Sequence, residues 1–217
     1  MSTWLLLFAL LPSRAAAGDL VLESRVAMEL YAGTALLART WGPARLQIQE
    51  LEPGLKTLKV VRGERSDLVD VQVPDGGAIS LAVDDAQISS APAAPAAVGP
   101  TLELRAALGQ RFGVILDGKR VAVIGHTAPV RVLDVEAGTH HLELRTADLT
   151  VVWARGDLDL VPDDLLVVTG QEGYAPLVSG REGAFRLAGA ATQRSASEPS
   201  ATVPEAPALP DAAGSGG

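Results

Sequence analysis

Short runs of alternating apolar and polar residues are the feature that most limits what this chain can fold into. The clearest run is 140–145, where Leu142 and Leu144 alternate with polar neighbours. A spacing of two places every second side chain on one face of a β-strand, whereas one face of a helix needs spacings of three and four. Similar runs are separated by turn signals such as Asp117-Gly118, a dipeptide that favours a tight hairpin. We therefore predict an all-β protein of short antiparallel strands, each with one buried and one wet face.

The alternation falls in two blocks that resemble each other. A shift of 84 positions lays residues 46–60 on 130–144 with the apolar positions in register. Residues 30–33 also match 115–118 with one residue of slippage. This self-similarity predicts an internal repeat. Because each block contains about seven short strands, we expect two tandem small antiparallel β-sandwich modules of Ig-like size, each closing its own aliphatic core.

Composition divides the rest of the chain. We expect a first module over 18–85, a Pro/Ala-rich linker over 86–100 and a second module over 101–190. Residues 88–100 carry no charge and many prolines, which makes them unsuited to a strand ladder. The Gly-rich stretch 170–190 is either an edge hairpin of the second module or a frayed extension. Residues 191–217 are Pro-rich and lack large apolar residues, so we predict a disordered tail.

The first 17 residues have the pattern of a cleaved signal peptide. The apolar run 4–11 is followed by Arg14 and then by three alanines that end at Ala17. Signal peptidase accepts small residues of this kind, and the run is far shorter than the roughly 20 residues of a membrane-spanning helix. We predict an exported protein, periplasmic or extracellular at the cell surface, with no integral membrane span in the mature chain.

Charge and composition exclude several classes of function. The formal net charge is -8 and no basic run occurs, which argues against nucleic acid and against an anionic membrane surface as partners. The absence of cysteine removes disulfides, thiolate nucleophiles and Cys-based zinc sites. Aromatic residues are only 4% of the chain, so any core must be filled by Leu, Val, Ile and Ala.

The order of strands and turns resembles the PEGA-type β modules of bacterial surface and envelope proteins. In the second block, 114–119 is a strand that ends in Asp-Gly, 126–130 carries the Thr-x-Pro turn, and 135–144 holds the turn before a strand that opens with His. Residues 30–33 and 51–56 are the looser counterparts in the first block. The resemblance implies two divergent tandem copies of a non-catalytic envelope module, with no shared active site and no cofactor.

The three histidines are the residues most suited to a metal site. His140 and His141 are neighbours on a predicted strand, so they point to opposite faces and cannot easily chelate one ion. A site would need His126 with one of them and a carboxylate such as Asp117 or Asp134. We favour the alternative that all three are strand and turn residues, and we predict no bound metal.

Nucleophilic and phosphate-binding chemistry find no support in the sequence. The acidic clusters 84–85, 157–159 and 163–164 lack the spacing of a calcium loop, so we interpret them as solvated turn residues. No Ser lies in a G-x-S-x-G elbow, and no Walker A loop occurs. We therefore predict no catalytic residue, no cofactor and no enzymatic activity.

Two tryptophans remain as candidate binding residues. Trp41 lies in the turn-like stretch 39–43 and could present its ring to a sugar or peptide, or else plug the end of the first sandwich. Trp153 follows two valines in a predicted strand, which favours a place in the core.

The leading hypothesis is a non-catalytic exported protein that binds or spaces other envelope components, by accepting a partner strand at an exposed sheet edge. The first alternative is a carbohydrate-binding module that uses an exposed Trp41. The second alternative is a metal-dependent hydrolase that uses His126 and His140. The expected partner is an envelope protein or a glycan whose identity the sequence does not supply.

Overall fold

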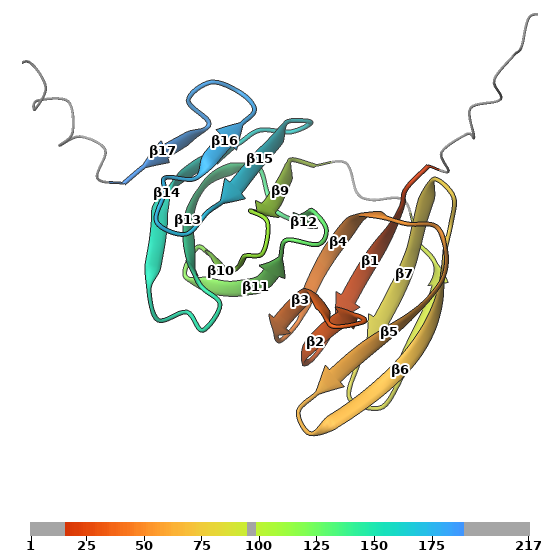
Figure 1. The fold of residues 1–217 in the computed structure, drawn as a ribbon. Coiled ribbons are helices and arrows are strands. Elements are labelled where there is room, and N and C mark those ends of the chain that lie inside the picture. Colours follow the sequence, from red (N-terminus) through yellow and green to blue (C-terminus); the bar gives the residue numbers. More distant parts are fainter. Residues whose placement is uncertain (1–15, 95–98, 189–217) are drawn as a thin grey trace, which may run out of the picture.

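The structure, a computed structural model, describes residues 16–94 and 99–188. Within these ranges the chain forms strands and turns, without a helix, and so contains no helix that could cross a membrane. The strands form two sheets, one of eight strands and one of nine, which confirms the predicted all-β sandwich architecture (Figure 1). The predicted signal peptide, apart from Ala16 and Ala17, and the predicted disordered tail lie outside the described residues.

Each module contributes four strands to the eight-stranded sheet, and the first and second modules contribute four and five strands to the nine-stranded sheet. The first module contains β1 (Gly18–Ser24), β2 (Ala27–Ala32), β3 (Ala35–Trp41), β4 (Ala44–Leu51), β5 (Gly54–Arg62), β6 (Arg65–Val73), β7 (Gly77–Val83) and β8 (Ile88–Pro92). The second contains β9 (Thr101–Ala106), β10 (Arg111–Leu116), β11 (Lys119–Gly125), β12 (Val130–Val132), β13 (Gly138–Thr146), β14 (Val152–Leu160), β15 (Leu165–Gly170), β16 (Leu177–Ser179) and β17 (Phe185–Leu187).

The strand order demonstrates the internal repeat. The eight-stranded sheet runs β16-β15-β9-β12-β4-β1-β7-β8, so it reads the same in each module from the centre outward. The nine-stranded sheet runs β17-β14-β13-β10-β11-β3-β2-β5-β6, again with equivalent strands at equivalent places. Most pairs are antiparallel as predicted, but β1–β7 and β9–β15 are parallel in both modules. The equivalent strand of β6 is therefore β14, and that of β4 is β12.

Turn chemistry and alternation explain the local structure. The predicted Asp117-Gly118 hairpin joins β10 to β11, with φ of 51° and 73° at the two turn residues. Asp and Gly are among the few residues that adopt this left-handed backbone readily. On β13, Leu142 and Leu144 are buried while the residues between and beside them are more exposed, as the alternation predicted. Phe112 on β10 is fully buried, and the Trp153 ring packs against it at 6.0 Å, which confirms Trp153 as a core residue.

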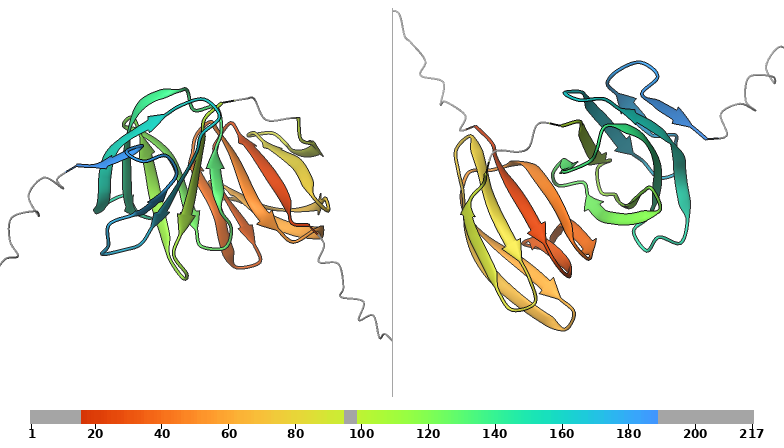
Figure 2. Two further views of the ribbon diagram at one scale, coloured as in Figure 1. Left: turned by 90° about the horizontal axis from the view of Figure 1, so that it is seen from above. Right: turned by 180° about the vertical axis from the view of Figure 1, so that it is seen from behind.

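The two modules are joined more closely than the sequence predicted. β4 pairs with β12 and β3 pairs with β11, so both sheets continue from one module into the other (Figure 2). The buried side chains form one hydrophobic cluster that includes residues of both modules. The expectation of two separately closed cores is therefore wrong. The physical reason is that β3, β4, β11 and β12 each have a sheet edge that their own module leaves unpaired, and these edges pair with one another.

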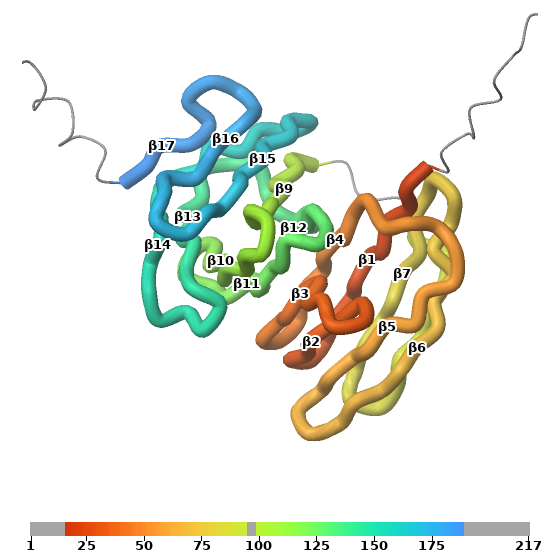
Figure 3. Tube along the Cα trace, in the orientation of Figure 1, coloured from red at the N-terminus to blue at the C-terminus, as the bar shows by residue number. Residues whose placement is uncertain are grey.

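Two further expectations need correction. Within the predicted linker, Ile88–Pro92 forms β8 on the edge of β7, so this part does hold a ladder. Ala93 donates its N–H to Ala78, and by alternation Pro92, which has no N–H, faces away from β7 as an edge strand permits. In the stretch 170–190, β16 and β17 do not form a hairpin: β16 pairs with β15 in one sheet and β17 with β14 in the other (Figure 3).

Candidate functional site

The fold separates the histidines that a metal site would require. His126 follows the end of β11, where Gly125 pairs with Arg111 at the start of β10. His140 lies at the opposite end of the β10–β11 hairpin, beside the turn residue Asp117. Among the described residues, no group of three or more His, Asp or Glu side chains could hold a metal ion. The described residues therefore do not bring His126 and His140 together at one site.

His140 and Asp117 instead form a structural pair. The His140 Nδ1 lies 2.7 Å from Asp117 Oδ2, and Nε2 lies 2.9 Å from the Glu136 carbonyl oxygen. Burial opposes the charged imidazole, but the hydrogen bonds to Asp117 and Glu136 outweigh it and raise the pKa of His140. The hydrogen bond from His140, together with the His141 N–H, lowers the pKa of Asp117. The pair closes the β10–β11 turn onto β13.

The acidic clusters are occupied by contacts within the chain. Asp84 accepts the N–H groups of Ala86 and Gln87, both at 2.8 Å, and these bonds lower its pKa. Arg181 binds Asp159 at 2.9 Å and Asp164 at 3.1 Å. Each cluster thus stabilises a turn or a loop.

A groove of about 500 Å³ lies where the two modules meet. Its walls come from the start of β4, the β10–β11 hairpin and the segment between β12 and β13. Arg45, one of the lining residues, binds Glu23 at 3.1 Å and Asp134 at 3.2 Å. Because acids and bases line the groove together and the Arg45 guanidinium is already paired, the groove has no net preference for an anion or a cation.

The outer face of the eight-stranded sheet carries a polar network across the module boundary. Glu103 is 2% exposed and binds Arg105 at 2.6 Å and Arg131 at 3.1 Å. Arg131 lies opposite Gln47, which donates to Asp19 at 2.5 Å. These partners satisfy the buried Glu103 carboxylate. We therefore interpret the network as a structural contact between the two modules.

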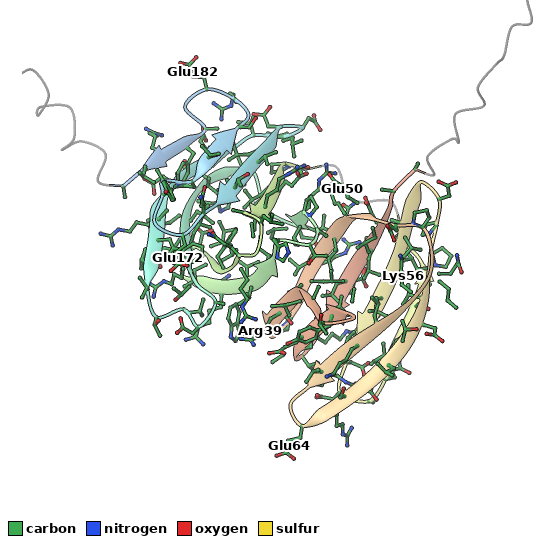
Figure 4. All side chains as sticks on the ribbon, viewed as in Figure 1. Arg39, Glu50, Lys56, Glu64, Glu172 and Glu182 are labelled. Atoms are coloured by element: carbon green, nitrogen blue, oxygen red, sulfur yellow. The ribbon has the colours of Figure 1, made fainter. Side chains whose placement is uncertain are left out.

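The outer face of the nine-stranded sheet places two aromatic residues beside an ion pair. Trp41 is the last residue of β3, half-buried, and is not part of the hydrophobic cluster. Arg39, two residues before it, binds Glu29 at 2.5 Å, and the Tyr31 hydroxyl donates to the same carboxylate. Lys59 lies 6.0 Å over the Tyr31 ring. Figure 4 labels Arg39 near the module boundary. Trp41, the Glu29–Arg39 pair and Tyr31 thus follow one another along the outer face of β2 and β3.

Strand β6 forms one edge of the nine-stranded sheet. It pairs with β5 through nine consecutive residues without a bulge, and no described strand lies on its other side. Arg62 and Arg65 flank the two-residue turn between β5 and β6, and such a flanking pair is hydrogen-bonded. Because hydrogen-bonded and non-hydrogen-bonded pairs alternate along an antiparallel ladder, every second residue of β6 points its backbone N–H and C=O away from β5. These residues are Ser66, Leu68, Asp70 and Gln72. We call these four residues the β6 edge. Leu68 is 73% exposed at its centre. The hairpin tip, near Glu64, lies at the end of the first module remote from the second (Figure 4).

The second module shows how the same edge is occupied. Its equivalent strand β14 carries β17, with Gly156, Asp157 and Leu158 opposite Leu187, Arg186 and Phe185. The Asp159 N–H donates to Ala184 at 2.7 Å, and the Ala188 N–H donates to Arg155 at 2.8 Å. The residues of β14 that face β17 correspond to Leu68, Asp70 and Gln72. The alternation in 65–73 indicates a strand, but no signal in the sequence shows that this strand has only one neighbour.

Comparisons with known proteins give little further guidance. No family model matches the chain, and no curated protein matches it in sequence. Among solved structures, the chain is similar to CBMbc, a family CBM26 module of Amy13K from Eubacterium rectale solved in complex with maltoheptaose. The two are 15% identical, the alignment covers 77% of this chain and 100% of that one, and the TM-score is 0.25. A TM-score this low does not assign a function to this chain.

Proposed function

We propose that this chain is a non-catalytic, exported binding module that recruits an envelope protein by accepting an extended segment of it along the β6 edge. The observation that carries the proposal is the difference between the modules: β14 has a strand on its outer edge and β6 has none among the described residues. Main-chain hydrogen bonds supply affinity in such strand addition, and side chains on alternate positions supply specificity.

The local design of β6 supports this role. Exposed edge strands are usually shortened, bulged, interrupted by proline or supplied with charged side chains, because a free edge is a template for pairing. β6 carries Arg65, Asp67 and Asp70, but it contains no proline, no glycine and no bulge, and it presents an exposed leucine. By contrast, the edge strands β16 and β17 have three residues each, and β8 ends in Pro92. The β6 edge is thus the longest uninterrupted edge of the described strands.

A photoreactive amino acid at Ser66 tests the proposal in the cells that export the protein. We expect a discrete crosslinked product from Ser66 and none from the same amino acid at Glu182, an exposed loop residue of the second module. Leu68→Pro should abolish the product, because proline removes an outward N–H without breaking a bond to β5. Leu68→Ala keeps that N–H and should retain the product. Crosslinking that Leu68→Pro leaves unchanged, with the variant folded by circular dichroism, would refute strand addition.

The export step has its own test. The run 4–11 and the alanines that follow predict cleavage after Ala17, so N-terminal sequencing of the protein from the periplasm or medium should begin at Gly18. An intact N-terminus in the cytoplasm would contradict this part of the proposal.

Glycan binding is the second candidate, and one observation favours it. Trp41, Tyr31 and the Glu29–Arg39 pair share the outer face of neighbouring strands β2 and β3. Titration with a panel of envelope polysaccharides should quench tryptophan fluorescence in the wild type and in Trp153→Phe, but not in Trp41→Phe. If no polysaccharide changes the signal, or if Trp41→Phe responds as the wild type does, this function is excluded.

A further inference from the structure

We infer that the β6 edge selects an antiparallel segment with a basic residue opposite Asp70, flanked by small apolar residues. The inference rests on the proposed strand addition and names the chemistry of the partner. It is drawn from the second module, where β17 is a bound strand on the equivalent edge.

The preference for a basic residue follows from an arrangement of aspartates that is repeated in the two modules. Asp157 on β14 lies opposite Arg186 of β17. Asp70 occupies the equivalent position on β6, and both aspartates contact the equivalent residue of the preceding strand: Thr57 donates to Asp70 at 2.6 Å, and His141 lies 3.0 Å from Asp157. Among the described residues Asp70 has no basic partner. Opposite charges on directly opposed strand residues stabilise the pair, so a Lys or Arg is the favoured residue there.

The size of the flanking residues follows from the core side of the edge. Phe185 and Leu187 turn inward and pack against the hydrophobic cluster. Gly156 lets β17 approach closely: a Cβ at this glycine would lie 2.4 Å from the Arg186 carbonyl oxygen and 2.8 Å from the Phe185 ring. The equivalent residue on β6 is Val69, since Leu58 pairs with Val69 as Leu142 pairs with Gly156. A segment that pairs with β6 must therefore run farther from Val69 than β17 runs from Gly156, and it must carry apolar residues smaller than phenylalanine there.

A second copy of this chain that pairs through its own β6 strand does not supply the basic residue. In an antiparallel pairing of two β6 strands, the outward positions oppose one another. Asp70 would then face Ser66, Leu68, Asp70 or Gln72 of the other copy, and none of these is basic. Charge complementarity therefore favours a segment of a different protein over a second β6 strand.

Synthetic peptides test the inference on the full chain. The probe has the sequence of residues 182–188 with Phe185→Val, and two further peptides add Arg186→Gln or Arg186→Glu. Affinity is measured by fluorescence anisotropy, and hydrogen exchange locates the bound peptide. We expect the arginine peptide to protect the amides of the β6 edge, to bind about threefold tighter than the Gln peptide and about tenfold tighter than the Glu peptide.

Charge reversal on the protein supplies the matched control. Asp70→Lys should invert the order of the Arg and Glu peptides, whereas Asp75→Lys, an equal charge change in the exposed turn after β6, should leave it intact. Equal binding of all three peptides at β6 would overturn the basic preference and leave strand addition standing. Absence of any protection at β6 while the Ser66 crosslink persists would overturn it also. A dimer by ultracentrifugation that Leu68→Pro dissociates would make a second copy the partner and refute the inference.

Discussion

Gln47 and Arg131 lie opposite each other where β4 pairs with β12, and they are also equivalent residues, 84 positions apart in the repeat. A residue that pairs with its own equivalent marks a two-fold relationship between the modules. The β3–β11 pair obeys the same rule, because Arg39 lies opposite Val123, its equivalent 84 positions later. The contact between the modules therefore resembles the isologous contact of a symmetric dimer, because equivalent strands of the two modules pair with each other.

This junction predicts that the two modules unfold together. The sheets and the hydrophobic cluster are continuous across it, so calorimetry should show one transition for the whole chain. Gly125→Ala should lower the free energy of unfolding by about 1–3 kcal/mol, the usual cost of overpacking. The reason is that the new Cβ would lie 2.2 Å from the Leu36 carbonyl oxygen across the junction.

Gly42→Ala is the matched control for this change. No atom lies within 4 Å of a Cβ built at Gly42, so its effect should be small. Two separate transitions in the wild type, or equal effects of the two substitutions, would contradict a shared structural unit.

The His140–Asp117 pair predicts a pH dependence of stability. The pKa of His140 is raised above 6.5, so its contribution is complete below that pH and is lost as the pH rises through the folded pKa. The pKa of Asp117 is lowered below 3.8, so its contribution is present above that pH and is lost as the pH falls through the folded pKa. Asp117→Asn should therefore lower the Tm more at about pH 5.5 than at about pH 8.5.

Asparagine suits this position because it tolerates the left-handed backbone of Asp117, where φ is 51°. Thr127→Val, which changes no titrating group at an exposed position of another loop, is the control and should change the Tm equally at the two pH values. A Tm loss in Asp117→Asn that is equal at both would show that the charged pair contributes nothing.

The loop between β13 and β14 contains a carboxyl group with a strongly lowered pKa. Hydrogen bonds from the Thr146 hydroxyl and from the Thr150 N–H and hydroxyl lower the pKa of Asp148 to about 2. The carboxyl resonance of Asp148 in an NMR titration should therefore move near that pH. Thr146→Val should raise the midpoint, since it removes the first of these donors, and a midpoint near 3.8 in the wild type would contradict the hydrogen-bonded loop.

Local features of the fold could be predicted from the sequence because they depend on neighbouring residues. The alternation around Leu142 and the Asp117-Gly118 turn specified strands and a hairpin, and the repeat specified two similar modules. The joining of the modules could not be predicted, because alternation shows which face of a strand is buried but not which strand lies beside it. β8 was missed for a related reason: only the side of the strand that faces β7 needs backbone donors.

The candidate sites divide in the same way. Composition excluded cysteine chemistry. The alternation of side chains along a strand correctly placed His140 and His141 on opposite faces of β13. The distance between His126 and His140 depended on the hairpin direction, which the sequence left open. The β6 edge could not be anticipated at all, because its sequence has the same alternation as a paired strand, and only the sheet order shows that one side is free.

Gly156 offers a way to convert the occupied edge into a free one. Its Cβ would lie 2.4 Å from the Arg186 carbonyl oxygen and 2.8 Å from the Phe185 ring, so Gly156→Val should displace β17 from β14. We expect faster hydrogen exchange at the amides of Asp159 and Ala188, which donate across this pair, and a lower Tm.

Arg155→Val is the matched control, because it adds the same β-branched residue at the adjacent, exposed position of β14. If Gly156→Val exchanges no faster than this control at Asp159 and Ala188, then β17 is not held by the space at Gly156. In that case Val69 on β6 would no longer explain why a large aromatic residue is excluded from the free edge, since the two positions are equivalent and obey the same packing.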